Sequence, residues 1–134
     1  MRSKATVVSV ILMLLFTSCA HKPMQAPVQV TCRADTILKV SFSRDVLPIL
    51  TSNCALSGCH SGGAPKGHLN LDAANAYEQL WQSGSGFIDT ESVTSSLLYS
   101  QLLSVSDPMP PTGKLDSCSI SLIKKWIQQK GMNN

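Results

Sequence analysis

The sequence predicts a small all-α domain, and three observations support this. Several stretches carry apolar residues at helical spacing, segments rich in glycine and proline separate them, and no stretch alternates apolar and polar residues as a strand does. The chain has 134 residues, which suits one domain. We therefore expect about four short helices joined by long Gly/Pro loops.

The first expected helix spans residues 41–54. Ser43 is the expected N-cap, and Pro48 falls near the first turn, where a missing N–H costs least. Apolar residues at 46, 47, 49 and 50 would form its buried face. This helix would place Cys54 at its C-terminal end.

Three further helices are expected. Asp72 would cap a helix that runs to about Gln82, residues 95–104 would form a short helix, and the last would begin near residue 117. Gly131 is a natural stop for that final helix. The segments between them hold clustered glycines and prolines and are expected to be loops.

The N-terminus has the features of a signal peptide. Arg2 and Lys4 precede an apolar run at residues 7–16, which is too short to span a bilayer comfortably. Small residues then precede Cys19, an arrangement that resembles a bacterial lipoprotein cleavage site. The alternative is an ordinary signal peptide with an incidental cysteine.

This leader divides the chain into three parts. Residues 1–18 are expected to be a lipoprotein signal peptide, residues 19–31 a tether anchored by lipid at Cys19, and residues 32–134 the folded domain. Cleavage before Cys19 leaves nine of the 11 basic residues against eight acidic ones. A nearly neutral chain with scattered lysines argues against a nucleic-acid partner.

The cysteines suggest the chemistry. Cys54, Cys59 and His60 form a C-x4-C-H motif, and four cysteines outside the lipid anchor allow three disulfide pairings. One alternative is a pair of plain disulfides with Cys54–Cys59 closing a small loop. A zinc site is disfavoured because a second ligand pair is missing. The other alternative is covalent haem attachment at Cys54 and Cys59, although the usual signature C-x-x-C-H has two fewer residues between the cysteines. Cys32 and Cys118 would then form a disulfide.

Met109 lies in the segment Asp-Pro-Met-Pro-Pro at 107–111. A methionine between prolines in a polar loop is a poor core position, so we favour a role as a soft metal ligand over that of a core gap-filler. His68 is the rival ligand, but it follows His60 on the same loop and would have to reach the opposite side of a haem.

Together these features resemble class I c-type cytochromes, and more closely the small lipid-anchored cytochrome c domains of Gram-negative cell envelopes. The resemblance covers roughly residues 32–131. A four-residue spacer between the cysteines occurs as a variant in this family. The segments that carry the match are Phe42–Leu50, Asn53–His60, Leu69–Leu71, Ser96–Tyr99, Asp107–Pro111 and Leu122–Ile127.

The resemblance implies one covalently bound haem c with about four short helices around it. Cys54 and Cys59 would attach the haem, and His60 and Met109 would be the axial iron ligands. Some relatives also have a disulfide at the places of Cys32 and Cys118.

The remaining pocket residues are expected by analogy. A backbone carbonyl after the motif holds the second ring nitrogen of the ligand histidine in cytochromes c, and Pro65 is the candidate for His60. Leucines and a tryptophan would line the haem pocket, although each could equally be general helix core. These residues are Leu69, Leu71, Leu98, Leu102 and Trp126.

The expected function is that of a mono-haem, one-electron carrier and not an enzyme. Its partners would be redox proteins that dock weakly and transiently. Alanine after Cys19 favours the outer over the inner membrane, with the domain in the periplasm or at the cell surface. The alternatives are a haem-based sensor or peroxidase-like enzyme with an open sixth position, and a haem-free disulfide domain that acts in adhesion.

Overall fold

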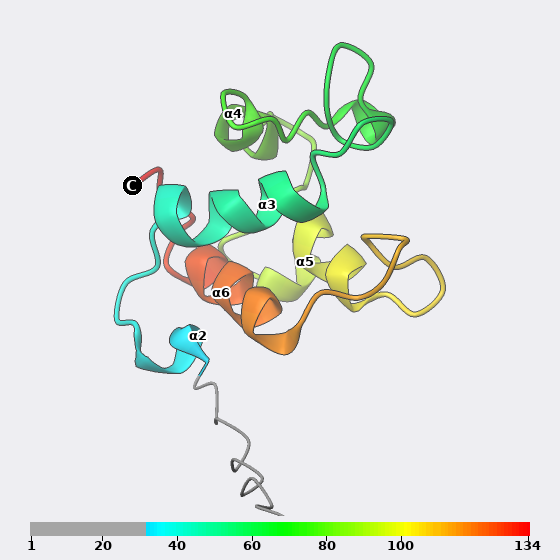
Figure 1. The fold of residues 1–134 in the computed structure, drawn as a ribbon. Coiled ribbons are helices and arrows are strands. Elements are labelled where there is room, and N and C mark those ends of the chain that lie inside the picture. The colour runs from blue at the N-terminus through cyan, green and yellow to red at the C-terminus, as the bar shows by residue number, and fades with distance from the viewer. Residues whose placement is uncertain (1–31) are drawn as a thin grey trace, which may run out of the picture. The chain divides into compact units, whose positions relative to one another are not determined.

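The computed structural model describes residues 32–134, and the signal peptide, the tether and lipidation at Cys19 lie outside that range. Within it the chain forms helices and turns and no strand, so the all-α prediction is confirmed (Figure 1). No helix in these residues is long and apolar enough to cross a membrane. The elements are α2 (Arg33–Thr36), the π-turn η1 (Phe42–Val46), α3 (Leu47–Asn53), the 3-10 turn η2 (Lys66–His68), α4 (Ala76–Leu80), the 3-10 turn η3 (Val93–Ser95), α5 (Leu97–Leu103) and α6 (Ser117–Gln128).

The N-cap of the first predicted helix is Ser41, two residues before the expected Ser43. The Ser41 side chain accepts a hydrogen bond from the Arg44 N–H, and the buried Asp45 carboxylate accepts one from the Ser41 N–H at 2.8 Å. Ser43 instead donates its hydroxyl to the Asn134 carbonyl at 2.8 Å. Ser43 lies inside the first turn, beyond the N-cap position.

The first helix delivers Cys54 as expected. The π-turn η1 ends just before the α-helical segment α3, in which Pro48 occupies the first turn and needs no N–H partner. Cys54 is the C-cap of α3, and its N–H still donates to the Leu50 carbonyl at 2.9 Å.

The second helix is shorter than expected and Asp72 does not cap it. The Asp72 carboxylate accepts a hydrogen bond from the Gly62 N–H at 3.0 Å, and Asn75 occupies the N-cap position of α4. The expected C-terminal end at Gln82 is also wrong, because α4 ends at Leu80. Helices α5 and α6 lie where the apolar spacing places them.

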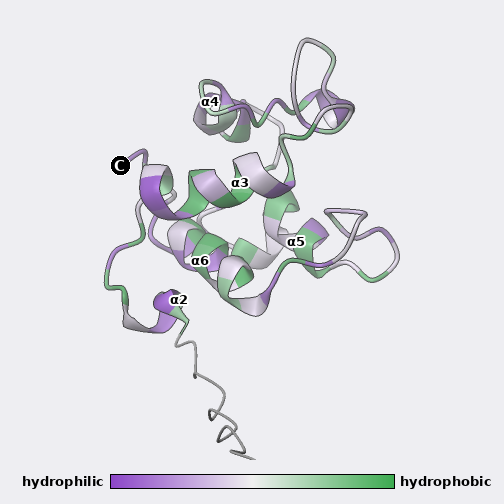
Figure 2. Ribbon diagram, viewed as in Figure 1, coloured by the Kyte–Doolittle hydropathy of each residue, from purple (hydrophilic) through white to green (hydrophobic). Residues whose placement is uncertain are grey.

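The core forms where the apolar faces of α3, α5 and α6 meet (Figure 2). Its aromatic part is a cluster in which the rings of Phe42 and Trp126 lie 5.2 Å apart and Tyr77 packs edge-on against Phe42, also at 5.2 Å. The Trp126 indole N–H donates to the Met132 carbonyl at 2.9 Å, so the one polar atom of this buried ring is paired.

The last helix ends one residue before the place predicted from Gly131. Gln129 is the C-cap, and Lys130, with a φ of 70°, takes the left-handed C′ position expected for the glycine. Gly131 follows with a φ of 55°, and its N–H donates to the Trp126 carbonyl at 2.9 Å. A Cβ at this position would lie 2.8 Å from the Trp81 ring, so a larger residue would push that ring away.

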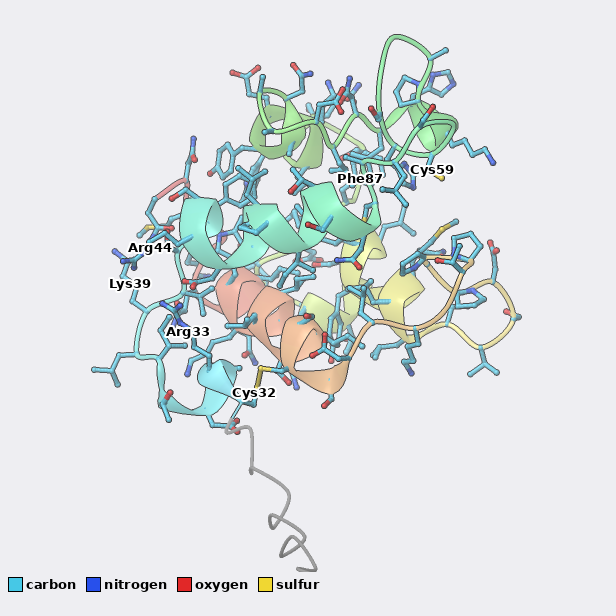
Figure 3. The ribbon with its side chains drawn as sticks, in the orientation of Figure 1. Cys32, Arg33, Lys39, Arg44, Cys59 and Phe87 are labelled. Atoms are coloured by element: carbon cyan, nitrogen blue, oxygen red, sulfur yellow. A yellow bond between two sulfur atoms is a disulfide. The ribbon has the colours of Figure 1, made fainter. Side chains whose placement is uncertain are left out.

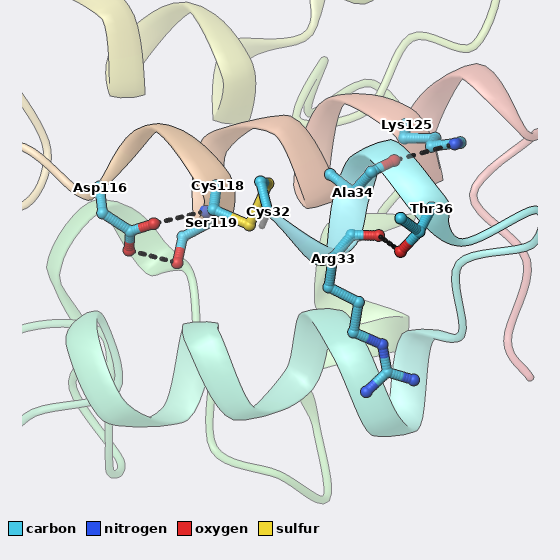
Figure 4. The surroundings of a disulfide bond; sticks show 8 residues. All are labelled: Cys32, Arg33, Ala34, Thr36, Asp116, Cys118, Ser119 and Lys125. Atoms are coloured by element: carbon cyan, nitrogen blue, oxygen red, sulfur yellow. Dashed lines mark hydrogen bonds between the residues drawn. A yellow bond between two sulfur atoms is a disulfide. The ribbon is translucent and has the colours of Figure 1, made fainter. Parts of the chain in front are cut away.

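The one-turn helix α2 has no counterpart among the expected helices. The disulfide between Cys32 and Cys118, with Cα atoms 5.3 Å apart, links it to the beginning of α6, as the predicted pairing requires (Figure 4). The Lys125 ammonium also donates to the carbonyls of Ala34 and Ile37 at 3.0 and 2.7 Å. The segment before the first helix is thus fastened to α6 at two places.

Candidate functional site

An apolar cleft of about 240 Å³ brings the predicted ligands together. Cys54, His60 and Met109 line it, although they come from the end of α3, the loop after it and the loop after α5. Four of the predicted pocket residues form much of its wall, namely Leu69, Leu71, Leu98 and Leu102.

A second cleft, of about 130 Å³, adjoins the first at the same three residues. Cys54, His60 and Met109 line both hollows, and Cys59 and Pro110 line only the second. Figure 3 shows Cys59 on the loop between α3 and α4. Both cysteines, the histidine and the methionine of the sequence motifs therefore border one continuous site.

Backbone hydrogen bonds shape the cysteine–histidine loop. The His60 N–H donates to the Cys54 carbonyl at 3.1 Å, and the His60 carbonyl accepts from the Leu71 N–H at 2.7 Å. The Cys59 carbonyl accepts from the Lys66 N–H at 2.8 Å. These bonds fix the histidine backbone on both sides, so the ring is directed by the loop and not by a side-chain contact.

Cys54 and Cys59 are half-buried free thiols, so the structure does not contain the small disulfide loop considered from the sequence. Burial raises the pKa of Cys54 to about 11, with a smaller contribution from the nearby Cys59. Near neutral pH Cys54 is therefore a protonated thiol in an apolar setting.

The His60 ring has an unsatisfied polar atom. Its Nδ1 is buried and has no hydrogen-bond partner. The bond expected from Pro65 is absent, because the Pro65 carbonyl accepts the His68 N–H at 3.2 Å instead, and Pro65 lines neither cleft. Burying this nitrogen without a partner destabilises the fold unless a ligand binds to it. An imidazole nitrogen can serve either as a hydrogen-bond donor or as a lone-pair donor.

Met109 is half-buried and is fixed to α5. Its N–H donates to the Gln101 carbonyl at 3.2 Å, which holds the proline-rich loop against the last turn of that helix. The next residue, Pro110, is buried. The loop therefore presents the Met109 thioether to the clefts from a supported backbone.

Two predicted residues lie elsewhere. His68, the rival ligand, is exposed and lines neither cleft. Trp126, expected in the haem pocket, is only 1% exposed but lies in the aromatic cluster with Phe42 and Tyr77. The Trp126 ring contacts Phe42 of η1 and Tyr77 of α4 and lines neither cleft.

The sequence reasoning missed several cleft residues. Leu97 and Gln101 share the α5 face of Leu98 and Leu102, so helical spacing around those two leucines could have found them. Phe87 also lines the cleft, but it lies in a glycine-containing loop without periodicity, and no pattern identified it.

The site combines apolar walls with groups that can bind a metal. Aliphatic and aromatic side chains form the walls, and two free thiols, an imidazole and a thioether line the two clefts. Among residues 32–134 no three His, Cys, Asp or Glu side chains gather as ligands for a bare ion.

Comparisons with known proteins add no assignment. No protein-family model matches the chain, and no curated protein and no solved structure matches it.

Proposed function

We propose that this chain is a mono-haem c-type cytochrome that carries single electrons in the bacterial cell envelope. The observation that carries the proposal is that Cys54, His60 and Met109 border both clefts together, with leucines around them. These residues belong to separate segments, so the fold assembles a set that the sequence motifs name independently.

Each residue then has a defined task. The thiols of Cys54 and Cys59 would hold the cofactor by thioether bonds. His60 and Met109 would provide one nitrogen and one sulfur donor to the iron, and two protein donors would leave no open position for a substrate. The bound haem supplies the one-electron Fe(II)/Fe(III) couple.

The leucine wall supports this role. Leu69, Leu71 and Leu102 are buried residues that give the cleft an apolar wall. A low-polarity setting disfavours the more highly charged oxidised iron and so raises the reduction potential. The methionine sulfur, a soft donor, acts in the same direction.

The same proposal includes a cytochrome c-like fold, a lipid anchor at Cys19, weak docking of redox partner proteins and a location at the outer membrane. The exposed surface near the clefts includes Lys66, which lines the second cleft, and Lys114 on the methionine loop. These lysines would guide an acidic partner toward the site.

The test is covalent haem on the full chain produced with a c-type maturation system. We expect the intact protein to gain the mass of one haem, and acid–acetone not to extract it. Cys54→Ser and Cys59→Ser should each leave one thioether and shift the pyridine haemochrome band. The double change Cys32→Ser with Cys118→Ser is the control and should keep the normal band. Haem that is extracted from the wild-type chain would refute covalent attachment.

A further inference from the structure

The described chain leaves two buried side-chain polar atoms without a hydrogen-bond partner, and both belong to residues of one cleft. They are Nδ1 of His60 and Oε1 of Gln101. Buried polar groups are normally paired, so each unpaired one needs an explanation. The proposed axial role gives one nitrogen of the His60 ring a partner but leaves Gln101 without a function.

Gln101 is tied to the methionine loop by its backbone. Its carbonyl accepts the Met109 N–H at 3.2 Å, and its side chain lines the cleft that Met109 also lines. A glutamine is unexpected on this face, because its neighbours Leu97, Leu98 and Leu102 are all apolar. A leucine here would complete the wall without leaving a buried amide atom unpaired.

The side-chain amide is a suitable donor for sulfur. Turning the amide about its last bond exchanges the oxygen with the NH2 group, and the two ends have nearly the same shape. Within the cleft, the Met109 thioether can accept a hydrogen bond, although weakly. The wall holds two other polar side chains: Asp107, which is exposed and bonds water readily, and His60, whose ring the proposed function assigns to the iron.

We propose that Gln101 is a positioning residue for Met109: its carbonyl fixes the loop backbone, and its side-chain amide donates a hydrogen bond to the Met109 sulfur. The inference rests on the proposed function, because the effect on Met109 is measured through the spectrum and reduction potential of the bound haem. The hydrogen bond holds the sulfur toward the iron and draws electron density from it. It therefore favours the ligated state and raises the reduction potential.

The experiment compares Gln101→Leu with Gln128→Leu in the haem-loaded full chain. Gln128 is an exposed residue of α6, so its change is the matched control. For Gln101→Leu we expect imidazole to displace Met109 with a roughly two- to tenfold higher apparent affinity, the factor that corresponds to one lost hydrogen bond. The potential should fall and the sulfur-to-iron band should weaken, while Gln128→Leu matches the wild type.

A second variant separates donation from packing. Gln101→Asn keeps the amide on a shorter side chain and should recover part of the wild-type imidazole affinity and potential. If the wild type shows a sulfur-to-iron band and Gln101→Leu leaves band, affinity and potential unchanged, the inference is wrong while the proposed function stands. Equal changes in Gln101→Leu and Gln101→Asn would assign Gln101 to packing and also overturn it. A wild type without covalent haem overturns the proposed function itself.

Discussion

At the scale of single residues, the site is built by backbone bonds and not by side-chain contacts. Backbone hydrogen bonds hold His60 through its N–H and carbonyl and Met109 through its N–H. The His60 ring and the Met109 sulfur are therefore free to meet a ligand. Leaving Nδ1 of His60 buried without a partner costs on the order of 1–3 kcal/mol. A bound group that paired with this nitrogen would remove the cost.

Replacing the methionine ligand should change the spectrum and the potential together. For Met109→Ala we expect loss of the sulfur-to-iron band, a lower reduction potential, and new binding of carbon monoxide and cyanide, because the soft sulfur that favours Fe(II) is gone. Optical titration and potentiometry measure these effects. Met132→Ala is the matched control, since Met132 lies outside both clefts.

His68, the rival candidate for the sixth ligand, should show no such effect when it is replaced. His68 is exposed, so His68→Ala should leave the iron low-spin. A high-spin iron in His68→Ala, with an unchanged spectrum in Met109→Ala, would assign the sixth position to His68 and contradict the proposed ligand pair. If neither change has an effect, the iron has an open position and the sensor or enzyme function becomes the better account.

Asp72 should make the loop sensitive to acid. The Gly62 N–H holds the pKa of Asp72 below its ordinary value, and the Ser61 side chain contributes in the same direction. Because the folded pKa is lowered, this stabilisation is complete above the unfolded value of about 3.9 and is lost as pH falls through the folded pKa. NMR titration of the Asp72 carboxyl should show the low value.

The Gly62 amide proton provides an internal check on Asp72. Its chemical shift should follow the same titration, and Asp72→Asn should abolish that dependence while leaving the rest of the spectrum in place. A carboxyl that titrates at its ordinary pKa, or a Gly62 shift that is independent of pH in the wild type, would contradict the contact.

At the scale of elements, the periodic helices were predictable and the contact-dependent ones were not. Apolar spacing identified α3, α5 and α6, whereas the four leucines that line the cleft were expected by analogy with c-type cytochromes. The short α4 and the one-turn α2 depend on partners distant in sequence, such as Gly62 for Asp72 and the carbonyl contacts of Lys125. No local pattern encodes those pairings.

The residues of the cleft also divide into those that the sequence predicted and those that it did not. Residues with a strong chemical signature, Cys54, His60 and Met109, were identified from spacing and composition, and the fold places them together. Trp126, expected there by analogy, lines neither cleft, because sequence shows that a helix face is buried but not which neighbour covers it. Phe87 was missed because a loop carries no period.

The disulfide that fastens α2 to α6 should contribute to stability without affecting the site. It joins residues 86 apart in sequence, a separation for which the chain-entropy model gives about 4–5 kcal/mol, and measured losses of about 2–5 kcal/mol are typical. The double change Cys32→Ser with Cys118→Ser should lower the unfolding free energy by that amount in denaturant titration.

The haem absorption spectrum tests whether the disulfide variant keeps an intact site. Neither Cys32 nor Cys118 lines a cleft, so the sulfur-to-iron band of the folded variant should equal that of the wild type. Two alkylatable thiols in the unreduced, denatured wild-type protein would show that the disulfide does not form.

At the scale of the whole molecule, the last residue closes the fold against the first helix (Figure 1). The Asn134 carbonyl accepts the Ser41 hydroxyl at 2.7 Å and the Ser43 N–H at 3.0 Å. Its side-chain Oδ1 accepts the Phe42 N–H at 2.8 Å, and its Nδ2 donates to the Val40 carbonyl. These bonds satisfy N–H groups that the beginning of a helix leaves unpaired.

Asn134→Ala should therefore destabilise the fold while leaving the site intact. It removes two side-chain hydrogen bonds, each with a net contribution of about 0.5–1.5 kcal/mol, so the unfolding free energy should fall by about 1–3 kcal/mol. Asn133→Ala changes the exposed neighbour and is the matched control. Because Asn134 lines neither cleft, the haem spectrum and potential should match the wild type. Equal stability of the two variants in denaturant titration would show that the Asn134 side chain does not close the fold.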